Sequence, residues 1–539
     1  MKGVGFRGWV TVLVVGHVAL GLLLYEPTLF PGGDNAGYMI LGESLRSGAG
    51  YRDLYLPGEP LHAKYPPLYP LLLAGAGWIG GVQLFKLLSL AFTAAGVGLA
   101  AHLGRRLVSP AAGLATAGAL ALNPVLLEYS HYVLSEAPFT FLVLLTLLLS
   151  TSPRARTRAA GMAAAAAAFL VRTAGLPLLL VVAAGALSRG ERRRAISALG
   201  LGLGVGGGWA IYQRLAAPGS PGYLGELILR NPYTPALGRV DAGDLVRRTA
   251  GNVWSYTSGV LPGSLTGFAP REFGLLLPVG LAVAALALIG WLSRATEEVG
   301  EAELFTLLYA GLICVWPEVW TDQRFLLPLL PFILLYAVDG TSRLAARLPG
   351  GHAGKRAHRL PAAILAMGLA ILALLSVFRL APDRARCIAA YRGGSPCDPP
   401  ALASFYGAAR WARANTPPET VVANRKPRLF YWYARRRGDV YRYSSEPELV
   451  LRSLEEMEAD YVAVDAISAT TARYLLPAIR AAPGRFEVVY RGGEPETVLL
   501  RFRRLPATAR TRDGLGTPPA GGDVARVPLR AERDVAGRR

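Results

Sequence analysis

Long apolar stretches, separated by short polar segments, cover the first 380 residues of the chain. A helix crosses a bilayer with about 20 apolar residues, and fewer suffice where neighbouring helices shield it. Eleven stretches fit this description, and they are residues 9–25, 83–103, 111–126, 136–150, 159–171, 174–187, 196–216, 273–292, 304–318, 325–340 and 361–380. The pattern therefore predicts a polytopic α-helical membrane domain over residues 1–380, with about 11 spans.

A further apolar segment, residues 68–81, directly follows the polar and proline-containing block Lys64–Pro67. We predict that it forms a helix at the membrane interface, and a twelfth span is the alternative. Residues 159–171 form the weakest predicted span, because the run Ala163–Ala168 has strong helix propensity but little hydrophobic drive.

The pattern changes near residue 381. Over residues 381–505, segments of helical period alternate with short apolar strands such as Tyr461–Val464, and Gly- or Pro-containing turns separate them. This pattern predicts a small α/β domain at the C-terminus. Residues 506–539 are rich in Pro, Gly, Ala and Arg and contain few large apolar residues, so we predict a disordered tail.

The composition agrees with a membrane protein. Apolar residues make up 52% of the chain and charged residues only 17%, with a mean hydropathy of +0.33. Soluble domains carry roughly 25% charged residues, so these values exclude a soluble globular enzyme, a disordered chain and a disulfide-dense secreted module. The net charge is +20, but much of it lies in short runs between apolar stretches, which indicates membrane topology rather than nucleic-acid binding.

These basic runs, among them Arg105–Arg106 and Arg192–Arg194, fall on one side of an eleven-span arrangement. The positive-inside rule makes that side cytosolic. The N-terminus is then cytosolic, whereas the C-terminal domain and two long loops, residues 26–67 and 217–272, are extracytosolic. The excess of arginine over lysine is typical of GC-rich bacterial genomes, so we predict a bacterial inner-membrane protein. In this topology Cys387 and Cys397 can form a disulfide, and two free thiols are the alternative.

Ionisable residues gather on the extracytosolic side in this arrangement, and His17 is the main exception at mid-membrane depth. Asp34 can accept a proton, whereas Lys64, Arg172 and Arg324 can hold an anion such as a phosphate. Transfer of a sugar from a lipid phosphate to a hydroxyl requires both functions. The departing phosphate needs cationic partners, and the attacking hydroxyl needs a general base.

Six short blocks near the predicted outer face combine charged residues with Pro, Gly and aromatic residues. They are Pro31–Tyr38, Gly50–Asp53, Lys64–Leu68, His131–Pro138, Val171–Pro177 and Arg324–Pro331. The first three blocks resemble the first outer loop of the GT-C glycosyltransferases. More narrowly, they resemble family 39, the group of protein O-mannosyltransferases and lipid A aminoarabinose transferases. The fourth block resembles the second acidic motif of that group, and the last two resemble further blocks.

The resemblance implies a role for each of these charged residues. Asp34 matches the catalytic aspartate of the first loop, so it is expected to act as the general base. Lys64 matches a position that contacts the donor phosphate, and Arg172 and Arg324 match basic positions that bind phosphate. Glu136 stands where many members carry an acidic catalytic residue, commonly Asp. Without the resemblance, Asp34 and Glu136 also fit helix starts, and Lys64 fits an interfacial lysine.

Three further residues are candidates for lining the substrate site: Tyr38, His62 and His131. Tyr38 equally fits an interfacial aromatic belt. His62 and Ala63 replace the acidic residue that can precede the Lys64 block in the family. A site formed by His62, Asp34 and Glu136 is possible for a divalent cation, but we predict that no metal or other cofactor is required.

The predicted function is therefore that of an integral membrane glycosyltransferase. It moves a sugar from a polyprenyl-phosphate donor to an extracytosolic lipid, glycan or protein acceptor, with inversion and with Asp34 as the base. Two alternatives remain open. A flippase or transporter of lipid-linked sugars predicts charged residues at mid-membrane depth and an internal repeat, and neither is visible in the sequence. A non-catalytic scaffold for envelope assembly predicts that Asp34→Asn leaves function intact.

Overall fold

The computed structural model describes residues 5–218, 222–232, 237–267, 276–347, 360–393 and 397–505. The tail predicted to be disordered, residues 506–539, lies outside these ranges. A helix lies in each of the predicted spans. These helices are α1 (Phe6–Leu23), α4 (Val82–Leu107), α5 (Pro110–Ala121), α7 (Glu136–Ser150), α8 (Ala155–Val171), α9 (Leu176–Ser188), α10 (Arg192–Ala216), α14 (Leu277–Glu297), α15 (Glu301–Val315), α17 (Leu330–Arg347) and α19 (Leu360–Arg392).

Within the described ranges, four of these helices are long and apolar enough to cross a membrane on their own: α1, α4, α10 and α14. Shorter apolar helices, including α5, α7 and α9, pack with them. The bundle therefore has the character of a membrane domain, and the number of spans and their orientation stay predictions.

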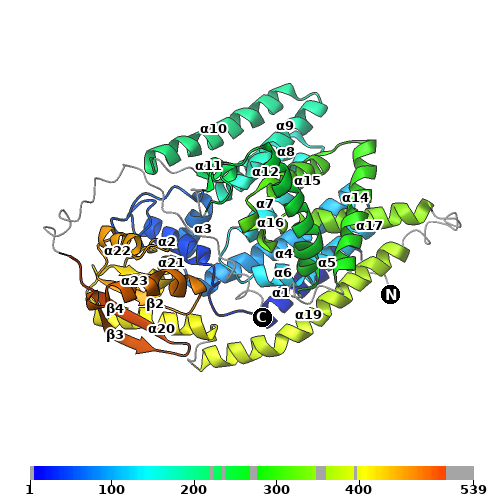
Figure 1. Ribbon diagram of the computed structural model, residues 1–539. Coiled ribbons are helices and arrows are strands. Elements are labelled where there is room, and N and C mark those ends of the chain that lie inside the picture. The colour runs from blue at the N-terminus through cyan, green and yellow to red at the C-terminus, as the bar shows by residue number, and fades with distance from the viewer. Residues whose placement is uncertain are drawn as a thin grey trace.

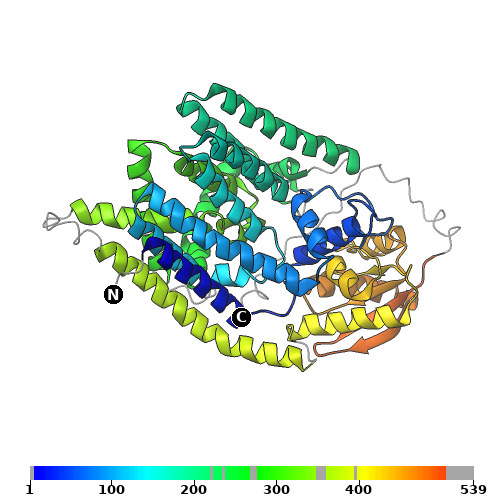
Figure 2. The ribbon, with the colours of Figure 1, turned by 180° about the vertical axis from the view of Figure 1, so that it is seen from behind.

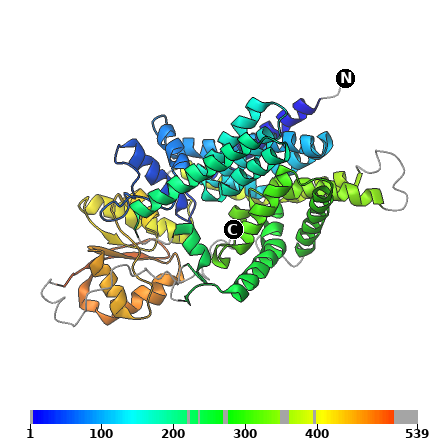
Figure 3. The same cartoon turned by 90° about the horizontal axis from the view of Figure 1, so that it is seen from above.

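The C-terminal domain lies at one end of the helical bundle, and the N-terminus lies at the opposite end (Figures 1 and 2). The long helix α19 runs along the bundle and leads to the C-terminal domain. Seen from above, the blue segment that carries α2 (Asp34–Arg46) and α3 (Leu68–Ala76) lies beside the C-terminal domain (Figure 3). The first predicted outer loop, residues 26–67, thus lies where the helical bundle meets the C-terminal domain.

Helix α19 differs from the sequence prediction, which ended the last span at residue 380. It continues through Pro382 to Arg392. Charged residues, Asp383, Arg384 and Arg386, follow residue 380, so a hydrophobicity criterion stops there, but Ala and Arg are good helix formers. A disulfide between Cys387 and Cys397, with Cα atoms 5.3 Å apart, ties the end of α19 to the chain just before the C-terminal domain.

The structure also contains several short helices. α3 has nine residues, and at about 1.5 Å per residue it is too short to cross a bilayer. The predicted loop 217–272 also contains helices that the sequence pattern did not reveal, because none of them has an apolar run as long as that of a membrane span. They are α11 (Gly222–Ile228), α12 (Ala242–Ser255), the π-helical turn η3 (Tyr256–Val260) and α13 (Leu261–Thr266).

The C-terminal domain contains a four-stranded sheet in the order β1-β2-β4-β3. β1 and β2 are parallel, whereas β4 is antiparallel to both β2 and β3. The strands are β1 (Val422–Ala423), β2 (Tyr461–Val464), β3 (Phe486–Gly492) and β4 (Thr497–Phe502). The accompanying helices are α20 (Pro400–Asn415), α21 (Pro427–Ala434), α22 (Pro447–Glu456) and α23 (Leu476–Ala481). The residues Val422, Val462 and Leu499 are buried, so the core of the domain lies between sheet and helices.

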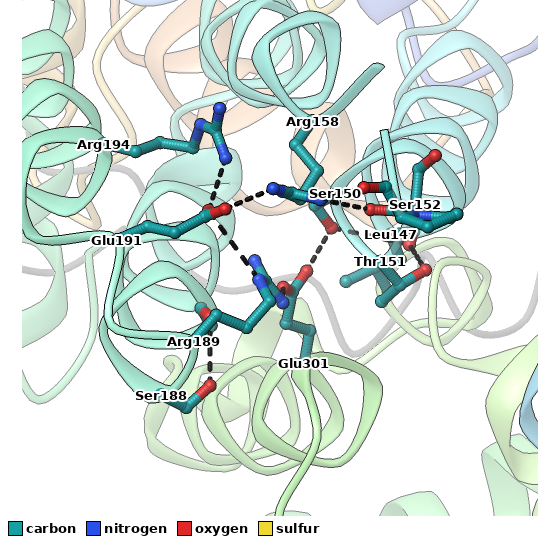
Figure 4. Close-up of polar contacts among 12 residues, drawn as sticks. Leu147, Ser150, Thr151, Ser152, Arg158, Ser188, Arg189, Glu191, Arg194 and Glu301 are labelled. Atoms are coloured by element: carbon teal, nitrogen blue, oxygen red, sulfur yellow. Dashed lines mark hydrogen bonds and ion pairs between the residues drawn. The ribbon is translucent and has the colours of Figure 1, made fainter. Parts of the chain in front are cut away.

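Ion pairs fix the bundle at the ends of α7 and α8 that lie away from Glu136 and Arg172 (Figure 4). Arg189, after α9, donates to the buried Glu301 at the start of α15 over 2.8 Å. Ser150, at the end of α7, also donates to Glu301. A second carboxylate, that of Glu191, pairs with the guanidiniums of Arg158, Arg189 and Arg194. These contacts join α7, α8, α10 and α15. The candidate site consists of the polar residues at the opposite ends of α7 and α8.

Candidate active site

Asp34 is the first residue of α2, and the turn before it requires glycine. Gly33, with φ of 90°, adopts the left-handed conformation that glycine tolerates. The Asp34 carboxylate accepts three hydrogen bonds. Arg324 Nη1 donates to Oδ2 over 2.9 Å, while Tyr65 Oη and Arg428 Nη1 donate to Oδ1 over 2.8 and 3.1 Å. The side chain remains 28% exposed, so the carboxylate is reachable from outside.

Glu136 is the first residue of α7 and is almost completely buried. Its Oε1 lies 2.5 Å from Arg172 Nη1 and 3.9 Å from Arg324 Nε. Within the described part of the chain, its Oε2 has no hydrogen-bond partner. Arg324 therefore lies between two acids, Asp34 and Glu136, and links them into one network.

The remaining network contacts orient Arg172, which follows the last residue of α8 in an extended conformation. Arg172 Nη1 donates to Ser135 Oγ over 3.1 Å, and the Tyr38 hydroxyl lies 2.9 Å from the same oxygen. The guanidiniums of Arg172 and Arg324 lie 5.6 and 4.9 Å from the centre of the Phe325 ring. Aromatic faces and carboxylates thus hold two cations side by side.

Lys64 lies at the edge of this network. Its Nζ is 3.2 Å from Glu226 Oε1 on α11 and 5.7 Å from the ring centres of Tyr223 and Trp320. The side chain is 44% exposed. Lys64 is accordingly held by α11, within the second long loop, and by Trp320.

His62 is engaged within its own loop. Its Nε2 accepts the backbone N–H of Tyr65 over 2.8 Å, so the proton is on Nδ1, which donates to the Asp53 carboxylate over 2.9 Å. Burial lowers the pKa of His62 below its ordinary value and favours this neutral form. His62 therefore shapes the loop that presents Lys64 and Tyr65.

His131 is buried against α1, where its Nε2 lies 2.7 Å from the carbonyl oxygen of Gly21. Among the described residues, no hydrogen bond or ion pair joins His131 to the Asp34 network. The single group of three potential metal ligands within 4.8 Å in the described ranges is Glu26 with Cys387 and Cys397, and these two sulfurs form the disulfide. The predicted absence of a required metal stays a prediction.

The electrostatics of the network keep Asp34 ionised. Burial alone would raise the pKa of the Asp34 carboxyl, but the neighbouring Arg324 and Arg428 guanidiniums hold it well below its ordinary value. At the edge of the network, burial raises the pKa of Asp322, which caps α16 (Gln323–Leu326) and accepts the backbone N–H of Arg324. The network has anionic groups to move a proton and cationic groups to bind an anion.

Sequence reasoning did not identify Arg428, which lies on α21 of the C-terminal domain. The signal in the sequence was weak: a basic run, Arg425-Lys426-Pro427-Arg428, in a chain rich in arginine. Pro427 occupies the first turn of α21, where its missing N–H does no harm. Only the packing of α21 on α2 brings Arg428 to Asp34.

The chain thus combines a bundle of apolar helices with an ion-paired network of acids and arginines near the ends of those helices. The chain has the fold of the GT-C membrane glycosyltransferases, as the sequence blocks predicted. No protein-family model matches the chain, and no curated protein matches its sequence.

Several solved structures align with most of this chain. ArnT from Cupriavidus metallidurans in the apo state aligns with a TM-score of 0.54 at 16% identity, over 92% of this chain and 98% of ArnT. ArnT bound to undecaprenyl phosphate gives a TM-score of 0.55 at 15% identity, over the same shares. The archaeal oligosaccharyltransferase AglB from Archaeoglobus fulgidus, in complex with an inhibitory peptide and a dolichol-phosphate, gives 0.54 at 15% identity, over 93% of this chain and 75% of AglB. At these identities the likeness establishes the fold.

Proposed function

We propose that the protein is a membrane glycosyltransferase that moves a sugar from a polyprenyl-phosphate donor to an extracytosolic acceptor, with inversion. The observation that carries the proposal is that Arg324 joins Asp34 and Glu136 in one ion-paired network. It unites a proton acceptor with cations suited to a phosphate. The ligands named for the solved structures, undecaprenyl phosphate with ArnT and dolichol-phosphate with AglB, support a lipid-phosphate donor here.

Arg172 and Arg324 would bind the donor phosphate, and Lys64 would meet it from the edge of the site. The departing polyprenyl phosphate is an anion, so it needs no protonation, and guanidiniums stabilise the charge that grows on its oxygen. Glu136 would hold Arg172 and Arg324 in position, since its buried carboxylate faces both. Tyr38 would line the sugar position, because its hydroxyl shares Ser135 Oγ with Arg172.

Asp34 would remove the proton from the acceptor hydroxyl. In the donor-free protein, its low pKa makes it a weak base, and both of its oxygens accept hydrogen bonds from neighbours. A phosphate competes with Asp34 for Arg324. When Arg324 turns to the phosphate, Oδ2 is freed and the pKa of Asp34 rises, so donor binding would prepare the base for the hydroxyl.

The position of the network favours this function over transport. Glu136 begins α7 and Arg172 follows α8, so both lie at helix ends rather than halfway along a helix. A transporter binds its cargo near mid-membrane depth and opens to both sides. A site at one end of the bundle is better suited to a reaction at one face.

The test uses the full chain in proteoliposomes with radiolabelled polyprenyl-phosphate sugars and a mixture of lipid, glycan and protein acceptors, and it follows transfer of the label together with release of free polyprenyl phosphate. We expect release by the wild type, and a loss of roughly 10²–10⁴-fold in Asp34→Asn, the range for removal of a general base. The matched control is Asp383→Asn, because Asp383 is an exposed ion-paired acid on α19. Equal release by wild type and Asp34→Asn would remove the catalytic assignment, and turnover by neither would refute the proposed reaction.

A further inference from the structure

Arg428 reaches the candidate site from the C-terminal domain, 394 positions along the chain from Asp34. Its Nη1 donates to Asp34 Oδ1 over 3.1 Å and to the Tyr65 hydroxyl over 2.8 Å. The guanidinium also lies 5.5 Å from the ring centres of both Tyr55 and Tyr65. These contacts hold the head group of Arg428 in the first outer loop rather than on the surface of its own domain.

The backbone around Arg428 is fitted to this contact. A Cβ atom at Gly37, one turn after Asp34 on α2, would lie 3.1 Å from Arg428 Cδ, so glycine lets the arginine pass close to the helix. At the other end of α21, Arg435 Nη1 pairs with Glu43 Oε2 over 2.6 Å. Both ends of α21 are thus bonded to α2, and only one of these ion pairs involves Asp34.

Charge gives Arg428 a distinct role in the network. Without it, the two guanidiniums of Arg172 and Arg324 face the two carboxylates of Asp34 and Glu136, and the directly ion-paired groups balance. Arg428 adds a third guanidinium to these two carboxylates, and a third acid, Asp322, faces Arg324 from the edge of the network. A polyprenyl-phosphate sugar is a phosphodiester with one negative charge, so it can replace the Asp34 carboxylate as the partner of Arg324 and Arg428.

Resting on the proposed function, we propose that Arg428 is a third phosphate-binding cation, so that the C-terminal domain completes the donor site. In the donor-free protein Asp34 holds both Arg324 and Arg428. An incoming phosphate competes with Asp34 for these guanidiniums, which turn toward it while they stay against Phe325 and the two tyrosines. The domain is then part of the catalytic unit and not only a cover or a platform for the acceptor.

The experiment measures binding of polyprenyl phosphate to the full chain in lipid nanodiscs, with unphosphorylated polyprenol as the control for the lipid tail. We expect Arg428→Gln to weaken polyprenyl phosphate binding at least about tenfold, because charge-assisted hydrogen bonds are the strong ones. Polyprenol binding should not change. Arg428→Lys, which keeps the charge, should recover most of the affinity.

The matched control is Arg435→Gln, which breaks the other ion pair between α21 and α2 and leaves Asp34 untouched. Its affinity for polyprenyl phosphate should stay within about threefold of the wild type. Wild-type affinity in Arg428→Gln would overturn the inference, and so would an equal loss in Arg435→Gln, because that result assigns Arg428 to domain docking. If Arg428→Gln does not fold, Arg428→Met replaces it and fills similar space against the tyrosines.

Failure of this inference and failure of the proposed function give different results. Suppose that the wild type releases polyprenyl phosphate from the donor and that the donor KM is unchanged in Arg428→Gln. This result refutes the role of Arg428 and leaves the glycosyltransferase proposal intact. Suppose instead that the wild type releases no polyprenyl phosphate from the donor, while Arg428→Gln binds polyprenyl phosphate more weakly. This result refutes the proposed reaction and retains the phosphate site.

Discussion

Replacement of Arg324 by Gln is the most direct probe of how the network works. Arg324 presents different nitrogens to two acids: Nη1 lies 2.9 Å from Asp34 Oδ2, and Nε lies 3.9 Å from Glu136 Oε1. The variant leaves Asp34 with Arg428 and Glu136 with Arg172. The ion pairs at either side therefore survive, while the link between them is lost.

The expected loss follows from what Arg324 would do for the departing phosphate. Removal of one preorganised donor to a developing oxyanion typically costs about 2.7–4 kcal/mol, or roughly 10²–10³-fold in rate. We therefore expect kcat/KM for the donor to fall by about that factor in Arg324→Gln. Arg324→Lys should recover only part of the activity, because a single ammonium cannot present two separate nitrogens to Asp34 and Glu136.

The assay is release of polyprenyl phosphate across a pH series, with kcat and KM determined at each pH. Arg324 helps to hold the pKa of Asp34 below its ordinary value, so its removal raises that pKa. A base works only when it is deprotonated, and kcat/KM reports the pKa values of the free enzyme. The acidic limb of the kcat/KM profile should therefore move to higher pH in Arg324→Gln. Activity within about threefold of the wild type, or full activity in Arg324→Lys, would refute the reasoning.

Two further predictions concern stability. Loss of the disulfide between Cys387 and Cys397, which are 10 positions apart, should lower the unfolding free energy by roughly 2–3 kcal/mol. Thermal unfolding of Cys387→Ala checks this, with Cys314→Ala as a control at the free cysteine. In the C-terminal domain, burial raises the pKa of Asp465 to about 6, so the folded state binds a proton that the unfolded state has already released above about pH 4. The contribution of Asp465 to stability should therefore fall as the pH rises from about 4 to 6. Hydrogen exchange of the β2 amides measures this fall in stability, and Asp465→Asn should abolish it. The same fall in Asp465→Asn as in the wild type would contradict the prediction.

The sequence determined the helices of the bundle because hydrophobic length is a local property. A helix lies in each predicted span, and the strand Tyr461–Val464 has the same bounds in the structure. The local sequence pattern did not predict the helices whose formation depends on tertiary packing. The helices α2 and α21, with 13 and 8 residues, are too short to stand out in the sequence, and they pack against each other in the structure.

The sequence also supplied most of the charged residues of the site, because an acid or arginine beside a membrane span stands out from its apolar surroundings. Asp34, Glu136, Arg172 and Arg324 do form one network. Their partners could not be read from the sequence, since which side chains meet depends on how distant helices pack. Only the tertiary structure brought Arg428 to Asp34, because two polar groups so far apart in the chain meet only when the C-terminal domain packs on the segment that carries α2.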